Sequence, residues 1–143
     1  MNKITIRDIQ KLKGGESPFA TVTAYDFVSA QNADAVDFPL LLVGDSAAMV
    51  VYGMENTIPI SMDELIFLVR AVCRGTEKAL VVADMPFMSY QTSPEVALEN
   101  AGQFIKKSGA GGGNGAEPKP STIFFKGKQS SCTLCLSLIH ISE

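Results

Sequence analysis

Apolar positions along this chain alternate between short unbroken runs and helix-periodic segments as far as about residue 110. Residues 19–24, 38–43 and 79–83 form three short runs rich in aliphatic side chains, and each run predicts a strand. The second and third runs lack the polar alternation of a sheet with one wet face. We therefore expect helices to cover these strands on both sides.

Helical segments separate these runs, and most of them carry a recognisable start signal. Asp26 can cap the helix that follows the first strand. Ser61 and Glu64 are spaced as a capping box, and Ser93 followed by Pro94 is typical of a helix start. Residues 47–57 show no such periodicity and predict an irregular segment. In the last helix we expect these side chains to point inward: Val96, Leu98, Ala101, Phe104 and Ile105.

The order of elements is a helix followed by strand–helix units, which indicates an α/β fold with a parallel sheet and right-handed crossovers. An open doubly wound sheet and an eight-unit barrel both begin in this way, and periodicity alone does not choose between them. In an unclosed barrel, we expect the core residues Leu40, Leu42, Val81 and Ala83 to face water.

The pattern breaks in the last part of the chain, so we divide it into residues 1–110 and a tail of residues 111–143. The tail opens on a glycine-rich stretch, which predicts a linker where another core strand is due. The final residues, Leu136 to Glu143, can be encoded by DNA that resembles a transposon-end adapter used for sequencing libraries. We interpret the tail as unstructured, or as an artefact of a frameshift and adapter read-through.

Composition excludes several classes of protein. The formal net charge of −3 gives no reason to expect a nucleic-acid or anionic-membrane partner. No apolar run approaches the roughly 18 residues of a membrane span, and the start lacks a signal-peptide core, so we expect a cytoplasmic protein. Cys73 lies in a helical pattern and predicts a small core residue. Cys132 and Cys135 lack a second pair and give little support for a zinc or redox site.

Two aspartates follow directly on apolar strands. Asp45 comes after the second strand and Asp84 after the third, and the carboxyl ends of parallel strands form the active face of such folds. Mg²⁺ is commonly bound through one or two carboxylates together with substrate and water. Ser46 could donate a hydrogen bond to a substrate carboxylate. The alternative is that each aspartate only caps the turn or helix after its strand.

A series of motifs resembles the amino-terminal part of the ketopantoate hydroxymethyltransferase family, with nearly the spacing of that family. The motifs run in this order: Thr21 to Asp26, Leu42 to Ser46, Met49 to Gly53, Thr57 to Ile60, Arg74-Gly75, Val81 to Tyr90, Pro94-Glu95 and Glu99 to Ala101. The block from Asp84 to Tyr90 is the most characteristic of them. The resemblance covers about 110 residues and under half of a full enzyme.

This resemblance implies the first three βα units of a TIM barrel of the phosphoenolpyruvate/pyruvate type. It implies that Asp45 and Asp84 bind Mg²⁺ and contact substrate, and that Ser46 holds the 2-oxo acid. It further implies transfer of a hydroxymethyl group from methylenetetrahydrofolate to 3-methyl-2-oxobutanoate, giving ketopantoate in pantothenate synthesis. The family also implies a homo-oligomer, a decamer in the full-length protein.

The sequence departs from the family in ways that bear on activity. Ala47-Ala48 replaces a Leu-Gly-like pair, a small change. The family's later lysine and glutamate block and its general-base glutamate have no counterpart here, so we assign no catalytic residue and expect this chain to be inactive alone. The alternatives are a Mg²⁺-dependent 2-oxo-acid lyase or mutase of the same superfamily, a receiver-like signalling module, and an inert fragment. The receiver needs an acidic pair near the first strand, which is not evident.

Overall fold

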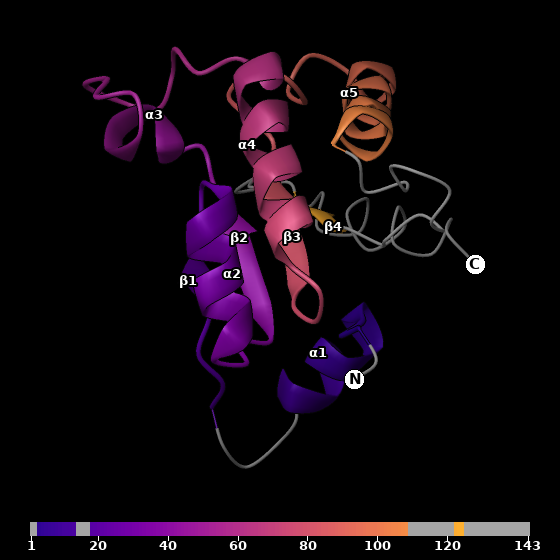
Figure 1. Cartoon of the computed structure of the whole chain (residues 1–143). Helices are drawn as coiled ribbons and strands as arrows, with labels where there is room; N and C mark the ends of the chain where they lie inside the picture. Colours follow the sequence, from indigo (N-terminus) through magenta and orange to yellow (C-terminus); the bar gives the residue numbers. More distant parts are fainter. Residues whose placement is uncertain (1–2, 14–17, 109–121, 125–143) are drawn as a thin grey trace.

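The architecture is a parallel sheet with helices on one face, seen in a computed structural model that describes residues 3–13, 18–108 and 122–124 (Figure 1). The strands stand in the order β1-β2-β3-β4, and every adjacent pair is parallel. In chain order the elements are α1 (Ile6–Lys13), β1 (Val22–Thr23), α2 (Phe27–Ala35), β2 (Leu40–Val43), α3 (Ala47–Val50), α4 (Met62–Gly75), β3 (Leu80–Asp84), α5 (Pro94–Lys107) and β4 (Thr122–Phe124). The predicted α/β class with a parallel sheet is thereby confirmed.

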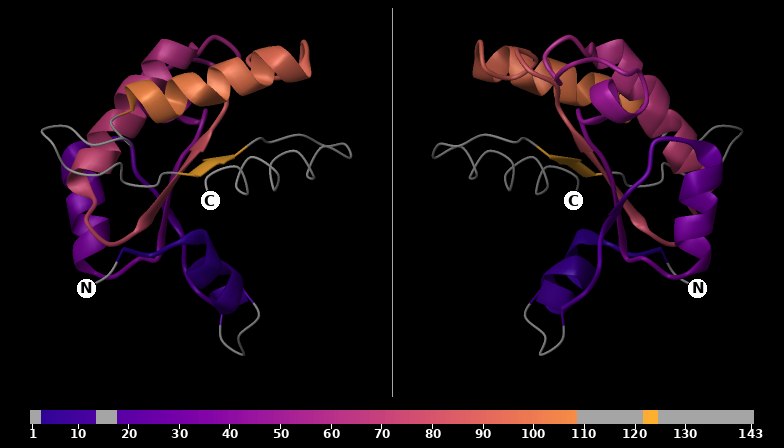
Figure 2. Two further views of the ribbon diagram at one scale, coloured as in Figure 1. Left: turned by 90° about the vertical axis from the view of Figure 1, so that its right-hand side faces the viewer. Right: turned by 90° about the vertical axis from the view of Figure 1, so that its left-hand side faces the viewer.

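The register of β2 against β3 decides which side chains face the helices. Leu41 lies opposite Val81 and Val43 opposite Ala83. These four belong to the buried core, which also includes the α4 residues Leu65, Val69 and Val72. Figure 2 shows α2 and α4 lying against this one face of the sheet. The expectation that Val81 and Ala83 face water is therefore wrong, because the period of a strand places them on the helix-covered face.

The other face of the same strands carries Leu40 and Leu42 on β2 and Leu80 and Val82 on β3. Leu40 and Leu42 are only half-buried, whereas Leu80 and Val82 are buried. The expectation that helices cover β2 on both sides is therefore wrong, because the described helices pack on the other face. At the two ends of the sheet, α1 lies beyond the amino-terminal ends of the strands and α3 beyond the carboxyl ends (Figure 1).

Each predicted helix start is confirmed by its capping hydrogen bond. The Asp26 carboxylate accepts from the Ser29 backbone N–H at 2.8 Å. Ser61 and Glu64 form the complete capping box of α4, and the Ser93 hydroxyl caps α5 with Pro94 in the first turn. These short-range bonds satisfy backbone N–H groups that have no partner within the helix.

Two local expectations are wrong. The short helix α3 occupies part of the segment predicted to be irregular. In α5, Val96, Leu98 and Ile105 are exposed, and the buried stripe consists of Ala97, Ala101 and Phe104. These buried residues are four and three positions apart, as on one face of a helix. The larger side chains beside them lie on other faces of α5.

Gly75 ends α4 for a reason other than a left-handed cap. Positive φ occurs among the described glycines only at Gly53, and the residue after Gly75, Thr76, is extended. A Cβ atom added to Gly75 would lie 2.4 Å from the Phe27 carbonyl oxygen and 3.0 Å from the Ala30 Cβ. The glycine is therefore required for the close approach of α2 and α4.

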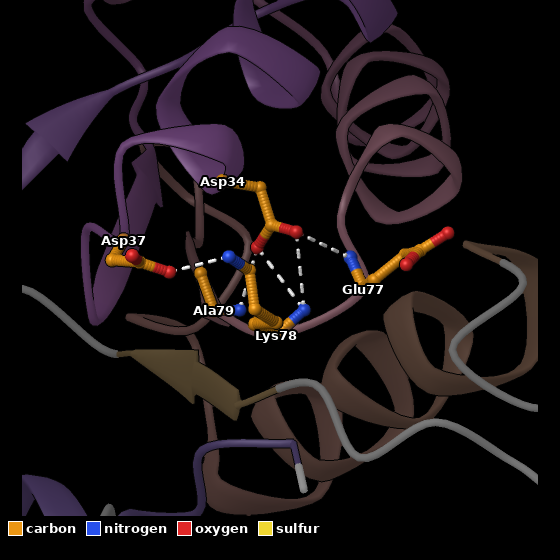
Figure 3. Close-up of polar contacts among 5 residues, drawn as sticks. All are labelled: Asp34, Asp37, Glu77, Lys78 and Ala79. Carbon is orange, nitrogen blue, oxygen red and sulfur yellow. Dashed lines mark hydrogen bonds and ion pairs between the residues drawn. The ribbon is translucent and has the colours of Figure 1, made fainter. Parts of the chain in front are cut away.

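Asp34 ties the end of α2 to the turn before β3 (Figure 3). Its buried carboxylate accepts hydrogen bonds from the backbone N–H groups of Glu77, Lys78 and Ala79, the last at 2.8 Å. Beside it, the Lys78 ammonium pairs with Asp37, whose φ is positive. The carboxylate satisfies three donors of a turn that has no sheet partner there, so it fixes where β3 begins.

Three further expectations concern the rest of the chain. Cys73 is buried as predicted. Within the tail, Thr122–Phe124 forms β4, with Thr122 opposite Val82, so the expected lack of structure is wrong for these residues because the edge of β3 offers unpaired backbone groups. The remaining tail, including Cys132 and Cys135, lies outside the described residues. None of the helices in the described ranges is long and apolar enough to cross a membrane.

Candidate functional site

The two strand-end aspartates line the same hollow at the carboxyl edge of the sheet. Asp84 is the last residue of β3, and Asp45 lies two residues beyond the end of β2. Because Val43 lies opposite Ala83, the parallel register brings both carboxylates to one edge. The hollow that they line has a volume of about 360 Å³, within the range of small-molecule sites.

Polar and apolar side chains line the hollow together. Besides the two aspartates, its polar lining comes from Thr57, Tyr90 and Gln91, and its apolar lining from Ile58, Met85 and Phe87. Asp84 and Met85 are buried, whereas Ile58 and Phe87 are more than half exposed. A ligand with a charged end and a short apolar end matches this arrangement.

Gly44 leaves room for Ser46 and Asp84 at the same point of the backbone. A Cβ added to Gly44 would lie 3.3 Å from Oδ2 of Asp84 and 3.3 Å from Oγ of Ser46. Both oxygens therefore flank the same short stretch of backbone. Ser46 is not among the residues that line the hollow, but its hydroxyl lies at the same edge of the sheet as the Asp84 carboxylate, which does.

Helix capping does not account for the two aspartates. The N-cap position of α3 is Ser46 and that of α5 is Ser93. Among the described residues, no hydrogen bond to the side chain of Asp45 is found, although the residue is partly buried. The simpler interpretation of Asp45 as a cap is thus not what the geometry shows.

Tyr90 is a member of the site that the sequence interpretation did not assign a role. Burial raises the pKa of its phenol, and the negative charges of Asp45 and Asp84 raise it further. The phenol thus lies within the field of both carboxylates and stays protonated over a wider pH range. The only sequence signal was its place at the end of the block that begins with Asp84.

Tyr25 is a second residue without a predicted role. Its phenol oxygen lies 2.7 Å from Oγ of Ser46, in a hydrogen bond that either hydroxyl can donate. Tyr25 lies two residues after the end of β1, so three neighbouring strands each place side chains at this edge. A tyrosine after a strand carries no distinctive spacing, and only the sheet order brings it to Ser46.

The donor set suits a hard divalent cation completed by other ligands. In the described part of the chain, no group of three or more His, Cys, Asp or Glu side chains gathers around one point. Two carboxylates at one hollow match Mg²⁺, which commonly takes one or two carboxylates and completes its octahedron with water and substrate oxygens. A zinc site, by contrast, needs nitrogen or sulfur ligands.

Solved structures with a similar arrangement define the fold. The phosphoenolpyruvate phosphomutase of Streptomyces platensis subsp. rosaceus matches 71% of this chain and 33% of its own, with a TM-score of 0.52 and 16% identity. An oxaloacetate acetylhydrolase matches 70% of this chain and 34% of its own, with a TM-score of 0.53 and 17% identity. These likenesses show the fold, and the chain forms part of a TIM barrel.

Sequence comparison identifies the family within that fold. The model of the ketopantoate hydroxymethyltransferase family matches residues 3–112, so the chain belongs to this family. The 3-methyl-2-oxobutanoate hydroxymethyltransferase of Chloroflexus aurantiacus is 51% identical over 108 residues, 76% of this chain and 38% of the relative. That of Carboxydothermus hydrogenoformans is 46% identical over 123 residues, 82% of this chain and 45% of the relative. The chain thus spans less than half the length of these relatives.

Proposed function

We propose that the protein transfers a hydroxymethyl group to 3-methyl-2-oxobutanoate, giving ketopantoate, the first step of pantothenate synthesis. The observation that carries this proposal is the pair of strand-end carboxylates, Asp45 and Asp84, at one hollow in a chain of this family. The name shared by the relatives specifies the acceptor and the group transferred. We add methylenetetrahydrofolate as the donor of the one-carbon unit.

In this proposal Asp45 and Asp84 hold Mg²⁺ and, with it, the 2-oxo acid. Bound there, the cation would act as a Lewis acid that draws electron density from the ketone and makes the proton on C3 more acidic. The two aspartates provide the negative charge that attracts the cation. Tyr90, whose phenol stays protonated, can donate a hydrogen bond in this hollow without adding charge.

Ser46 and the apolar lining residues select and orient the acid. The Ser46 hydroxyl donates a hydrogen bond to the substrate carboxylate from this edge of the sheet, where its oxygen and Oδ2 of Asp84 both lie next to Gly44. Ile58, Met85 and Phe87 offer apolar contact to the branched carbon chain. Burying that chain expels water from the reacting carbon, and each buried methyl-sized group stabilises binding by about 0.8 kcal/mol.

The overall reaction balances with one water. C3 of the acid loses its proton to a base and forms a bond to the one-carbon unit. Water supplies the oxygen of the new hydroxyl, and tetrahydrofolate leaves with both of its nitrogens protonated. We assign the base to none of the described residues, because the carboxylates at the hollow are committed to the cation.

The test is a ketopantoate assay on the full-length gene product with 3-methyl-2-oxobutanoate, methylenetetrahydrofolate and Mg²⁺. We expect turnover that a chelator abolishes and added Mg²⁺ restores. Asp45→Asn and Asp84→Asn should each weaken Mg²⁺ binding, measured by calorimetry, and lower kcat/KM at least tenfold, since each removes one charged ligand. Asp63→Asn, at an exposed carboxylate of α4, is the matched control.

Two outcomes would contradict this proposal. A full-length protein that binds Mg²⁺ but forms no ketopantoate would contradict the activity. Turnover that survives both aspartate substitutions would contradict the assignment of the metal site and leave the family membership untouched.

A further inference from the structure

We propose that Tyr25 is a positioning residue that orients the Ser46 hydroxyl toward the carboxylate of the 2-oxo acid. This inference deepens the proposed function and rests on it. It starts from the 2.7 Å hydrogen bond between the Tyr25 phenol and Oγ of Ser46, a contact between side chains that follow two neighbouring strands.

The Ser46 hydroxyl is not used by the helix that it precedes. Ser46 occupies the N-cap position of α3, but its backbone is helical and its side chain makes no capping bond. The capping serines of α4 and α5, Ser61 and Ser93, are instead in extended backbone and do accept from helix N–H groups. At Ser46 the hydroxyl is therefore engaged with Tyr25 in place of its usual structural role.

Chemistry assigns the direction of this bond. A phenol is a stronger acid and a better hydrogen-bond donor than an aliphatic alcohol. If Tyr25 donates, the bond occupies one lone pair of the Ser46 oxygen, and the Ser46 proton is then directed away from Tyr25. A hydroxyl that accepts one hydrogen bond also becomes a better donor in the next, so the pair is polarised toward an anion.

The position of Ser46 gives that proton a target. Its oxygen and Oδ2 of Asp84 lie at the same distance, 3.3 Å, from the point where a Gly44 Cβ would stand. Asp84 lines the hollow, and its negative charge excludes a second anion from binding there unless donors compensate. The Ser46 hydroxyl, which Tyr25 orients at the same edge of the sheet, is such a donor, and it favours a carboxylate-bearing ligand.

The effect should fall on substrate binding. Tyr25→Phe keeps the ring of a half-buried side chain and removes only the oxygen. In the full-length gene product with Mg²⁺, we expect KM for 3-methyl-2-oxobutanoate to rise about three- to tenfold, the range of one weakened hydrogen bond, with kcat changed less than about twofold. Tyr52→Phe, at an exposed tyrosine outside the hollow, should change neither constant.

A double-mutant cycle separates positioning from a general structural role. If Tyr25 acts through Ser46, Tyr25→Phe should have no further effect on KM in a Ser46→Ala background. Fluorotyrosine at position 25, which is a stronger donor of the same shape, should lower KM in the wild-type background and provides a second variant. The unfolding midpoint of each variant, measured in parallel, should stay within a few degrees of wild type.

The outcomes separate this inference from the proposed function. An unchanged KM in Tyr25→Phe, an additive effect in the cycle, or a loss confined to kcat and stability would overturn the positioning role alone. A wild-type protein that neither binds nor converts the 2-oxo acid would overturn the proposed function and this inference with it.

Discussion

A Cβ atom added to Gly44 would lie 3.3 Å from Oδ2 of Asp84, which makes the residue before Asp45 a spacer for the carboxylate on the neighbouring strand. The φ angle of Gly44 is not positive, so the lack of space, and not the backbone conformation, excludes a larger residue at this position. At this point of the carboxyl edge, the Asp84 side chain therefore packs directly against the backbone of Gly44.

We predict that Gly44→Ala lowers the affinity for Mg²⁺ and for the 2-oxo acid more than it lowers stability. The added methyl group pushes Asp84 and Ser46 aside by a few tenths of an ångström, and misplacement on that scale costs on the order of tenfold in binding. Calorimetry on the full-length gene product measures both affinities. Gly102→Ala, where an added Cβ meets nothing within 4 Å, is the control. Equal affinities in the two variants would contradict the spacer role.

We predict that Asp45→Asn lowers the pKa of Tyr90 in metal-free protein. Burial would still hold this pKa above the ordinary value of 10.0, but one of the two charges that raise it would be gone. The tyrosinate absorbance, with Tyr90→Phe as the reference that identifies the signal, follows the titration. Asp63→Asn should leave the pKa in place, and a Tyr90 pKa unaffected by Asp45→Asn would show that the phenol lies outside the field of that carboxylate.

The same raised pKa predicts how stability depends on alkaline pH. The folded protein holds the Tyr90 proton more tightly than the unfolded chain does, so this contribution is complete below the unfolded value near 10.0. It is lost as the pH rises through the folded pKa. Over the pH range from 10.0 up to the folded pKa, the free energy of unfolding should decline less for Tyr90→Phe than for wild type. Parallel declines would contradict the linkage.

We predict that Asp34→Asn destabilises the fold by roughly 2 kcal/mol, because the three backbone N–H groups lose a charged acceptor and one faces an amide donor. The control is Asp37→Asn, which removes the Lys78 ion pair but tolerates the positive φ of that position. Since that pair is at the surface, its loss should cost clearly less than the loss of the Asp34 carboxylate. Denaturant midpoints compare the two, and similar losses would show that Asp34 has no special structural role.

We predict that Gly75→Ala costs about 1–3 kcal/mol, because α2 and α4 must separate to relieve the contact with the Phe27 carbonyl. Gly102→Ala in α5 should instead be neutral or stabilise by up to about 1 kcal/mol, since alanine is the better helix former. Thermal unfolding of both variants provides the measurement. A tolerated alanine at position 75 would mean that the helices are not held at the spacing seen here.

From the sequence alone came the alternation of three strands with the helices that follow them, the helix starts at Asp26, Ser61 and Ser93, and the family. Caps depend on residues three positions apart, and apolar runs mark buried strands without reference to the rest of the chain. The same logic put Asp45 and Asp84 at strand ends, which was enough to propose a cation site.

Only the tertiary structure decided how those strand ends meet. The parallel register between β2 and β3 places both aspartates at one hollow and turns Val81 and Ala83 toward the helices. The pairing of β1 with β2 brings Tyr25 to Ser46, and the chain after β3 brings Tyr90 into the field of both carboxylates. The tertiary structure also adds β4 beside β3, where composition predicted none. These relationships join residues tens of positions apart, and the local sequence carries no information on such pairings because they arise from strand order and from the backbone hydrogen bonds of the sheet.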